Sequence, residues 1–163
     1  MQLPDAETLL CDLAQQIRPC LTANSALVGI HTGGAWLAQR LHQQLGQDIP
    51  LGVLNITFYR DDFSMAGLHP VVEPSVMPFE VEGRDLILVD DVLHTGRTVR
   101  AAMNELFDYG RPNSVHLAVL VDRGGRELPI AARYAGVVLT LAENQNIQLE
   151  QNEQGILNLA LIN

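Results

Sequence analysis

Apolar side chains recur with helical spacing in three segments of the chain. In the first segment, Leu10, Leu13 and Ile17 fall three or four positions apart, shortly after Asp5. Residues with this spacing lie on one face of an α-helix, and an aspartate just before such a run is typical of a helix N-terminus. The sequence therefore predicts an amphipathic helix here, and similar spacing predicts helices over residues 35–45 and 99–109.

Unbroken aliphatic runs predict buried strands. Residues 26–30, 86–89 and 115–121 form such runs, which are typical of strands covered on both faces of a parallel sheet. Shorter strand-like segments occupy residues 51–58, 136–141, 147–149 and 156–162. Because strands alternate with helices, the sequence predicts an α/β fold. We expect a single domain over residues 1–163, with a mostly parallel twisted sheet flanked by helices and a small C-terminal β element.

The stretch from about residue 60 to residue 83 follows neither pattern. It contains three prolines and two glycines and has no sustained apolar period. Long irregular loops inside a compact domain are uncommon and often cover a ligand site. We therefore expect a flexible active-site loop here.

Composition and charge narrow the classes of protein that fit. The formal net charge is -9, lysine is absent and all ten basic residues are arginines. Nucleic-acid binding usually needs a basic surface, and this balance argues against one, although a local arginine patch is compatible with it. The sequence has no apolar run of membrane-spanning length and no visible export signal, so we expect a cytoplasmic protein that does not enter a membrane. Cys11 and Cys20 have no ligand-spaced partners, which favours buried or free thiols over a disulfide or zinc site.

Three turns follow predicted strands, at residues 31–34, 90–98 and 122–126. Ligands of open parallel sheets bind beyond the carboxyl ends of the strands, so these turns form the candidate site. In the second turn, Thr95-Gly96-Arg97-Thr98 lies where a helix begins, and the unpaired N–H groups, hydroxyls and helix dipole suit a phosphate monoester.

Two carboxylates precede this phosphate turn, Asp90 and Asp91. They would repel a phosphate unless they bound another part of the same ligand. Vicinal hydroxyls, contacted directly or through hydrated Mg²⁺, would satisfy them. A sugar phosphate with a free diol therefore fits, whereas a Walker-type loop is excluded because its lysine is missing.

Several motifs resemble one enzyme family. LILVDDVLHTGRTVRAAM, residues 86–103, resembles the phosphoribosyl-pyrophosphate (PRPP) signature of type I phosphoribosyltransferases. LVGIHTGG, TFYRDD and GRPNSVHLAVLVDRGGRELPI are similar to segments of the pyrimidine operon regulatory proteins, also called bifunctional uracil phosphoribosyltransferases. The resemblance covers roughly residues 27–134. It implies the type I fold, conversion of uracil and PRPP to UMP and pyrophosphate, Mg²⁺ bound with PRPP, and a homodimer.

The resemblance also implies roles for individual residues. Asp90 and Asp91 are expected to bind the ribose hydroxyls and the Mg²⁺ carried by the substrate, and to be catalytic together with His94. His94 stands where related purine transferases carry an aspartate base, and it could exchange a proton, contact phosphate or only line the loop. The full set of implied PRPP-binding residues is Asp90, Asp91, Val92, Leu93, His94, Thr95, Gly96, Arg97 and Thr98.

Three other segments receive implied roles. The turn Thr32, Gly33 and Gly34 is expected to face pyrophosphate, because glycines let the backbone approach a ligand closely. Arg60 is expected to contact phosphate from the active-site loop. Asp122 and Arg123 are expected to border the base, although these residues and Arg126-Glu127 could instead form surface salt bridges or a subunit contact.

Two features depart from the family pattern. The family's pyrophosphate turn reads Thr-Arg-Gly, and Gly33 replaces the arginine here, which predicts weaker binding of PRPP or slower turnover. Regulatory members bind messenger RNA through a basic surface built from their N-terminal and C-terminal regions. Here Arg18 is the one basic residue among the first 25, and the last thirty residues have none. RNA binding is therefore less expected than the transferase fold.

Two other functions fit the same residues. One is a regulator that senses UMP or PRPP and controls pyrimidine gene expression, through RNA or through a protein partner. The other is a transferase for a different base, since the sequence does not reveal base specificity. Trp36 and the leucines of residues 37–45 are expected in the core.

Overall fold

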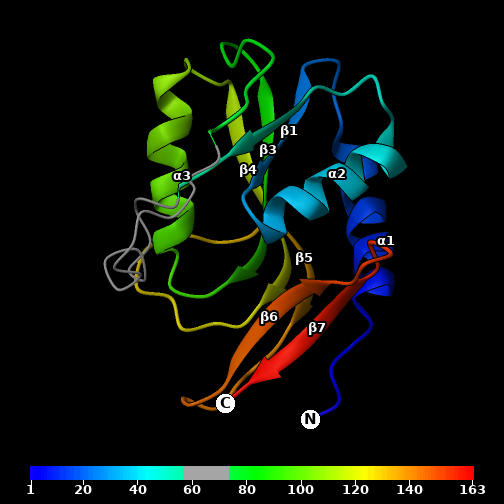
Figure 1. The fold of residues 1–163 in the computed structure, drawn as a ribbon. Coiled ribbons are helices and arrows are strands. Elements are labelled where there is room, and N and C mark those ends of the chain that lie inside the picture. Colours follow the sequence, from blue (N-terminus) through cyan, green and yellow to red (C-terminus); the bar gives the residue numbers. More distant parts are fainter. Residues whose placement is uncertain (57–73) are drawn as a thin grey trace.

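The computed structural model describes residues 1–56 and 74–163. In this part, five parallel strands form one sheet in the order β2-β1-β3-β4-β5, and two antiparallel strands form a separate hairpin (Figure 1). The strands are β1 (Ser25–Ile30), β2 (Leu51–Leu54), β3 (Asp85–Leu93), β4 (Ser114–Asp122), β5 (Tyr134–Val138), β6 (Asn146–Gln151) and β7 (Leu157–Ile162). The helices are α1 (Ala6–Ile17), α2 (Gly33–Leu45) and α3 (Arg97–Asp108), and a short 3-10 helix covers Arg18–Cys20.

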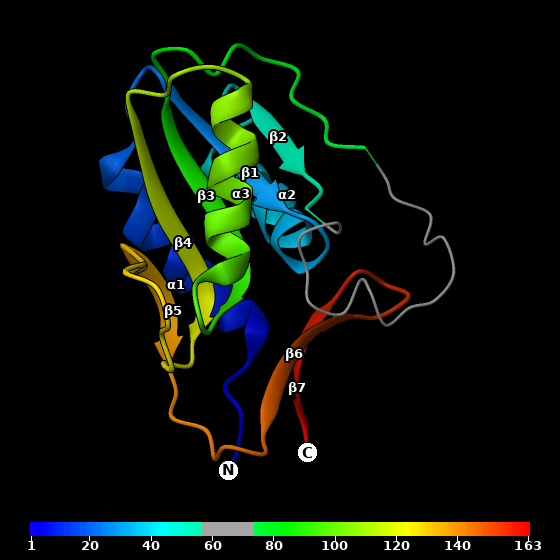
Figure 2. The same ribbon diagram turned by 90° about the vertical axis from the view of Figure 1, so that its left-hand side faces the viewer.

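The α/β class predicted from the sequence is confirmed, because helices cover both faces of the parallel sheet. Figure 2 shows α3 on one side of the sheet and α1 and α2 on the other. Along β3, Leu86 and Leu88 pack in the cluster that contains α3, whereas Ile87 and Val89 pack in the cluster that contains α1 and α2. This alternation explains why the run is aliphatic throughout: successive side chains face opposite layers, and both layers are apolar.

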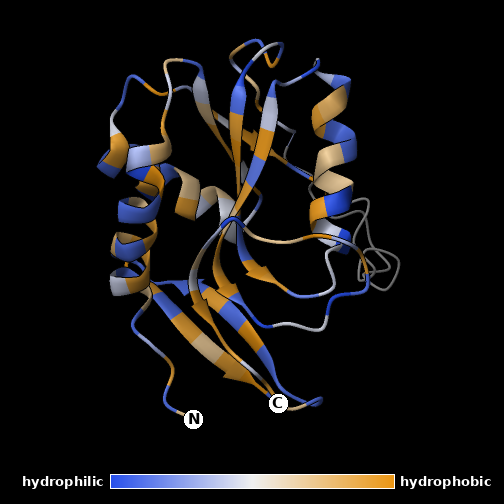
Figure 3. Cartoon of the chain, turned by 180° about the vertical axis from the view of Figure 1, so that it is seen from behind, coloured by the Kyte–Doolittle hydropathy of each residue, from blue (hydrophilic) through white to orange (hydrophobic). Residues whose placement is uncertain are grey.

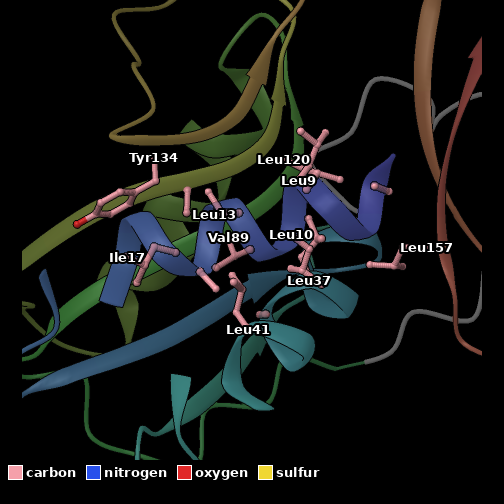
Figure 4. Packing of buried hydrophobic residues seen from close by; sticks show 14 of the residues in the cluster. Leu9, Leu10, Leu13, Ile17, Leu37, Leu41, Val89, Leu120, Tyr134 and Leu157 are labelled. Carbon is pink, nitrogen blue, oxygen red and sulfur yellow. The ribbon is translucent and has the colours of Figure 1, made fainter. Parts of the chain in front are cut away.

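The larger hydrophobic cluster joins the two helices on one face of the sheet. Figure 4 shows Leu10, Leu13 and Ile17 of α1 close to Leu37 and Leu41 of α2, with Val89 and Leu120 contributed by the sheet. All of these side chains are fully buried, and burying a leucine contributes about 2 kcal/mol. Figure 3 shows the apolar colour concentrated on the central strands, whereas the helices alternate between polar and apolar residues. The helical spacing read from the sequence therefore corresponds to the buried faces.

Among the predicted boundaries, the ends of two strands differ most from the structure. The strand β3 does not stop at Val89 but continues through the acidic pair to Leu93. The strand predicted over 51–58 ends at Leu54 as β2, and its last two positions lie outside the described residues. Of the irregular stretch 60–83, residues 60–73 also lie outside the described residues. The returning part contacts β2 through a bridge between Val76 and Val53.

The C-terminal hairpin packs on the larger hydrophobic cluster and is also tied to α1 and α2 through the Glu7–Arg40 ion pair. Glu7, in the first turn of α1, pairs with Arg40 of α2 and also accepts a hydrogen bond from Leu157 N in β7, at 2.9 Å. Arg40 in turn donates to Gly155 O at the hairpin turn, at 3.3 Å. The hydrogen bonds from Arg40 lower the pKa of Glu7 below its ordinary value, against the raising effect of partial burial. One carboxylate thus holds α1, α2 and the hairpin together.

Cys11 and Cys20 are free thiols, and both residues are exposed. Trp36 is only partly buried and packs against the edge of the larger cluster, so the expectation of a core position holds for the leucines of α2 but not fully for the tryptophan. Among residues 1–56 and 74–163, no helix combines the length and the apolar character needed to cross a bilayer.

The contacts of the Glu7 carboxylate with Arg40 and Leu157 N predict a pH dependence of stability. A carboxylate whose folded-state pKa is lowered contributes stability that is fully present above its unfolded pKa and is lost as the pH falls through the folded one. We expect Glu7→Gln to lower the free energy of unfolding by about 1 kcal/mol at pH 7. The difference from the wild type should shrink below about pH 4.

Thermal unfolding of both proteins at pH 7 and pH 3 measures this effect. Glu150→Gln is the matched control, because Glu150 is an exposed glutamate on the same hairpin. A loss of the same size at both pH values would contradict an electrostatic role for Glu7.

Candidate functional site

The carboxyl ends of three neighbouring strands define the candidate site. In the parallel register, Val28 of β1 pairs with Leu88 of β3, and Leu93 of β3 pairs with Asp122 of β4. Parallel strands that are paired in this way end at the same edge of the sheet, so the loops that follow them are neighbours. The three turns predicted from the sequence are therefore brought together at one edge.

The acidic pair lies inside β3 and not in the turn after it. Because side chains alternate along a strand, Asp90 faces the α3 layer and Asp91 faces the α2 layer. Asp90 is only 3% exposed, and its Oδ1 accepts a hydrogen bond from Asp91 N at 2.9 Å. Asp91 Oδ1 accepts from Val92 N at 2.8 Å. The two carboxylates are therefore adjacent in sequence but differ in their environment.

The glycine turn lies directly against Asp91. The peptide bond between His31 and Thr32 is cis, and α2 begins at Gly33. A Cβ atom on Gly33 would overlap the carboxylate of Asp91, and one on Gly34 would overlap the carbonyl oxygen of Val89. An arginine at position 33, as in the family pattern, would therefore require the Asp91 carboxylate to move. The close approach of the turn to β3 explains the glycine pair.

The predicted phosphate turn is the N-terminus of α3. Gly96 precedes the helix with φ of 91°, a left-handed conformation that glycine adopts easily, and Arg97 N donates to Thr95 Oγ1 at 3.1 Å. The first N–H groups of a helix have no partner within the helix, so this end attracts anions. The Arg97 side chain is turned toward Glu127, with a separation of 2.6 Å between Nε and Oε2. The groups that this helix end offers to an anion are therefore mainly backbone N–H groups and hydroxyls.

The loop after β4 braces the phosphate turn. Arg126 donates to His94 O at 2.9 Å, to Ile130 O at 2.9 Å, and to both carboxylate oxygens of Asp122 at 2.8 and 2.7 Å. The N–H groups of Glu127 and Leu128 donate to Thr95 O at 3.0 and 3.2 Å. The two turns that were recognised separately in the sequence thus form one hydrogen-bonded unit.

Asp122 and Arg123 both make contacts within the chain. Burial on its own would raise the pKa of Asp122, but the hydrogen bonds from Arg126 and from Gly124 N outweigh it and lower the pKa. Arg123 reaches the C-terminal hairpin, where NH1 donates to Asn146 Oδ1 at 2.7 Å and NH2 to Gln145 O at 3.0 Å. Asp122 thus pairs with Arg126 in a largely buried salt bridge, whereas Arg123 contacts the hairpin.

A cavity of about 510 Å³ opens between the sheet edge and the hairpin. Its lining residues are Thr32, Gly33, Trp36, Asp91, Asn146, Ile147, Gln148, Leu149 and Ile162. The sequence motifs point to only one side of this cavity. The hairpin wall was missed because its contribution depends on tertiary packing, and the sequence carries no local signal for it beyond the strands themselves.

The two remaining predicted site residues are placed differently. The His94 ring packs on Gly125, and Nδ1 lies 2.9 Å from Gly124 O. Arg60 lies outside the described residues. The structure therefore brings together the glycine turn, Asp91, the phosphate turn and the loop after β4, with His94 at the junction of the last two.

Removal of Arg126 should destabilise the protein, because it would leave the partly buried Asp122 carboxylate without its main partner. We expect Arg126→Ala to lower the free energy of unfolding by about 2 kcal/mol. Arg97→Ala is the matched control, because the Arg97–Glu127 pair is more than half exposed on both sides. Its loss should be below about 0.5 kcal/mol. Chemical denaturation of the three proteins measures both values, and equal losses would contradict the bracing role of Arg126.

Comparisons with known proteins agree with this geometry. Residues 3–153 match the phosphoribosyl transferase domain family. The "Bifunctional protein PyrR" of Nitrosococcus oceani is 62% identical over 126 residues, which cover 76% of this chain and 71% of that protein. The protein of the same name from Pseudomonas fluorescens is 50% identical over 153 residues, or 91% of each chain.

Solved structures show the same fold. A purine phosphoribosyltransferase from Pyrococcus horikoshii has a TM-score of 0.63 and 26% identity, covering 83% of this chain and 82% of that one. A hypoxanthine-guanine phosphoribosyltransferase from Bacillus anthracis has a TM-score of 0.67 at 19% identity, covering 85% and 83%, and shows the fold alone. The chain therefore belongs to the PyrR family of type I phosphoribosyltransferases.

Proposed function

We propose that this protein transfers the phosphoribosyl group of PRPP to uracil, which forms UMP and releases pyrophosphate. The observation that carries this proposal is the meeting of three features at one sheet edge: the Asp91 carboxylate, the close glycine turn and the open N-terminus of α3. Together they offer groups for a diol, a pyrophosphate and a phosphate monoester. Membership of the PyrR family supports uracil as the acceptor.

The phosphate turn is the proposed site of the 5′-phosphate. In this assignment, N–H groups at the start of α3 and the hydroxyls of Thr95 and Thr98 hold the phosphate oxygens. The adjoining residues Asp90, Asp91, Val92, Leu93, His94, Gly96 and Arg97 complete the proposed PRPP site. The bracing by Arg126 supports this role, because an anion site made of backbone groups binds well only when its backbone is held in place.

The acidic pair is the proposed site of the ribose hydroxyls. Asp91 lines the cavity and Asp90 is buried beside it, so we assign the direct ribose contact to Asp91 first. The glycine turn, Thr32 to Gly34, is the proposed pyrophosphate site. Asp122 and Arg123 border the base in this scheme, mainly by fixing the surrounding loops.

The donor set fits Mg²⁺ brought in by the substrate. Among residues 1–56 and 74–163, no group of three or more histidine, cysteine or acidic side chains could hold a metal alone. Mg²⁺ is commonly bound by one or two carboxylates together with substrate phosphates, and Asp91, which lines the cavity, can supply one, with Asp90 buried behind it. When bound, the ion would neutralise charge on the departing pyrophosphate.

Transfer of the phosphoribosyl group depends on the positioning of the two reactants more than on covalent catalysis. The bond from the ribose anomeric carbon to pyrophosphate breaks, a bond from that carbon to N1 of uracil forms, and the N1 proton is released. The chain orients the two reactants and excludes water. His94 donates from Nδ1 to Gly124 O in its neutral form, so Nε2 is the ring atom that can accept a proton or contact phosphate.

Substitution of the acidic pair tests the transferase function. Asp91→Asn and the double variant Asp90→Asn with Asp91→Asn should lower the rate of UMP formation at least 100-fold, because the ribose contacts and the Mg²⁺ charge balance are lost. Chromatography of reactions with Mg²⁺, PRPP and a panel of bases measures both the rate and the base preference. Asp108→Asn, an exposed carboxylate at the far end of α3, is the control and should retain the full rate.

The rate of UMP formation by the wild type, compared with the double variant, decides the proposal. If the wild type forms no more UMP than the double variant, the transferase function is wrong. A clear preference for another base would preserve the reaction class and correct the substrate.

A second proposed function is regulation in response to pyrimidine nucleotides. The curated relatives carry the name "bifunctional", which supports a role beyond catalysis. We propose that this role does not use RNA, because the net charge is -9 and the ends of the chain are nearly free of basic residues. Regulation through a protein partner that recognises the UMP-bound form is compatible with the negative net charge.

Gel mobility of pyrimidine-operon leader RNA tests the RNA version. We expect no shift at low salt, with or without UMP, while a basic RNA-binding protein shifts the same RNA as a positive control. A UMP-dependent shift that disappears as salt increases would contradict this expectation.

A further inference from the structure

The hairpin wall of the cavity contains one side chain whose orientation is fixed from two sides. Asn146 begins β6 and lines the cavity opposite Thr32, Gly33 and Asp91. Its Oδ1 accepts hydrogen bonds from Arg123 NH1 at 2.7 Å and from its neighbour Ile147 N at 3.0 Å. Both partners are obligatory donors, so the oxygen and nitrogen of the carboxamide are distinguished without ambiguity.

The amide nitrogen of Asn146 is left for a ligand. With both oxygen lone pairs used, the carboxamide can offer the cavity only its Nδ2 hydrogens. Asn146 is exposed, and its Nδ2 has no hydrogen-bond partner among residues 1–56 and 74–163. The structure therefore presents a hydrogen-bond donor, and no acceptor, at this point of the wall.

Arg123 contacts the hairpin but leaves one of its own hydrogen-bond donors unsatisfied. Its Nε is buried and lacks a hydrogen-bond partner among the described residues, and an unsatisfied buried N–H is unfavourable. The guanidinium is thus held in place by its two hydrogen bonds to Gln145 and Asn146, although one of its donors stays without a partner among the described residues. The backbone N–H of Arg123 also donates to Leu93 O at 3.0 Å, which ties this arrangement to the end of β3.

We infer that Asn146 is a specificity-determining residue that donates from Nδ2 to a ring carbonyl oxygen of the pyrimidine, and that Arg123 is a positioning residue which orients it. The inference rests on the proposed function, because it names the group that reads the base in the same cavity. A donor at this point favours a base that carries a carbonyl group there over one that carries an amino group. Neither residue is assigned this role by the motifs of the phosphate turn.

The sharpest variant is Asn146→Asp. An aspartate of the same shape keeps the acceptor bonds to Arg123 and Ile147, so the hairpin contact and the fold are retained, but the amino group is lost. We expect binding of UMP to weaken at least tenfold, because one hydrogen bond is lost and the carboxylate repels the ring carbonyl oxygen, while ribose 5-phosphate weakens far less. Calorimetric titration with the two ligands measures this difference, and Asn146→Ala should give the same pattern.

The matched control is Asn144→Ala, an exposed asparagine just before β6 that does not line the cavity. It should bind both ligands as the wild type does. Arg123→Met should weaken UMP several-fold, and the double variant with Asn146→Ala should bind UMP no more weakly than Asn146→Ala alone, because the two residues act through one contact.

Nucleotides with sulfur in place of one carbonyl oxygen identify the contacted atom. For one of the two analogues, 2-thio-UMP or 4-thio-UMP, the wild type and Asn146→Ala should have almost equal affinity. In that analogue the sulfur stands at the contacted position and is a weaker acceptor than oxygen. The inference is overturned if the Asn146 variants bind UMP normally, if they weaken UMP and ribose 5-phosphate alike, or if they lose both thio analogues as strongly as UMP. A wild type that binds neither UMP nor ribose 5-phosphate would instead contradict the proposed function.

Discussion

The close contact between the start of α2 and the end of β3 is the constraint on which the site depends. Two glycines allow the helix to begin where any Cβ would overlap Asp91 or the Val89 carbonyl. This contact brings one helix N-terminus against the carboxylate pair, and the turn after β3 supplies a second helix N-terminus a few residues later. Two positive helix ends therefore lie at an edge that also carries two carboxylates. A ligand with both anionic groups and hydroxyls is the kind of molecule that such an edge can accommodate.

Much of the fold could be predicted from the sequence because both periodicities are strong. The aliphatic runs mark the central strands, and α1 and α2 follow their apolar spacing closely. The end of β3 was missed for a physical reason. Polar residues usually mark a strand end, but Asp90 stays in the strand at 3% exposure because its carboxylate accepts a backbone hydrogen bond and faces the protected side of the sheet. The hydrogen bond offsets the cost of burying the Asp90 carboxylate, so the strand continues past a residue that would normally mark its end.

The candidate site was predictable only where its residues are close in sequence. The phosphate turn and the glycine turn were found because each is a short motif with its own chemistry. The third wall comes from β6, and its place depends on the Glu7–Arg40 pair and on Arg123, contacts between residues far apart along the chain. Apolar alternation predicts that such a hairpin exists, but it does not say which edge of the sheet the hairpin approaches. The same limit explains why the sequence marks Asp122 and Arg126 as charged residues of one turn, while their pairing is seen only in the structure.

The arginines in this region show how an acidic protein can hold an anionic substrate. Arg40, Arg97, Arg123 and Arg126 all bond to groups of the chain itself: carboxylates, carbonyl oxygens and an asparagine. These contacts hold the walls of the cavity and keep guanidinium charge engaged within the protein. In the proposed PRPP site, recognition of phosphate falls to backbone N–H groups and hydroxyls, which bind through geometry more than through net charge. Because the chain carries a net charge of -9, a cation that arrives with the pyrophosphate would supply charge balance in the proposed PRPP site.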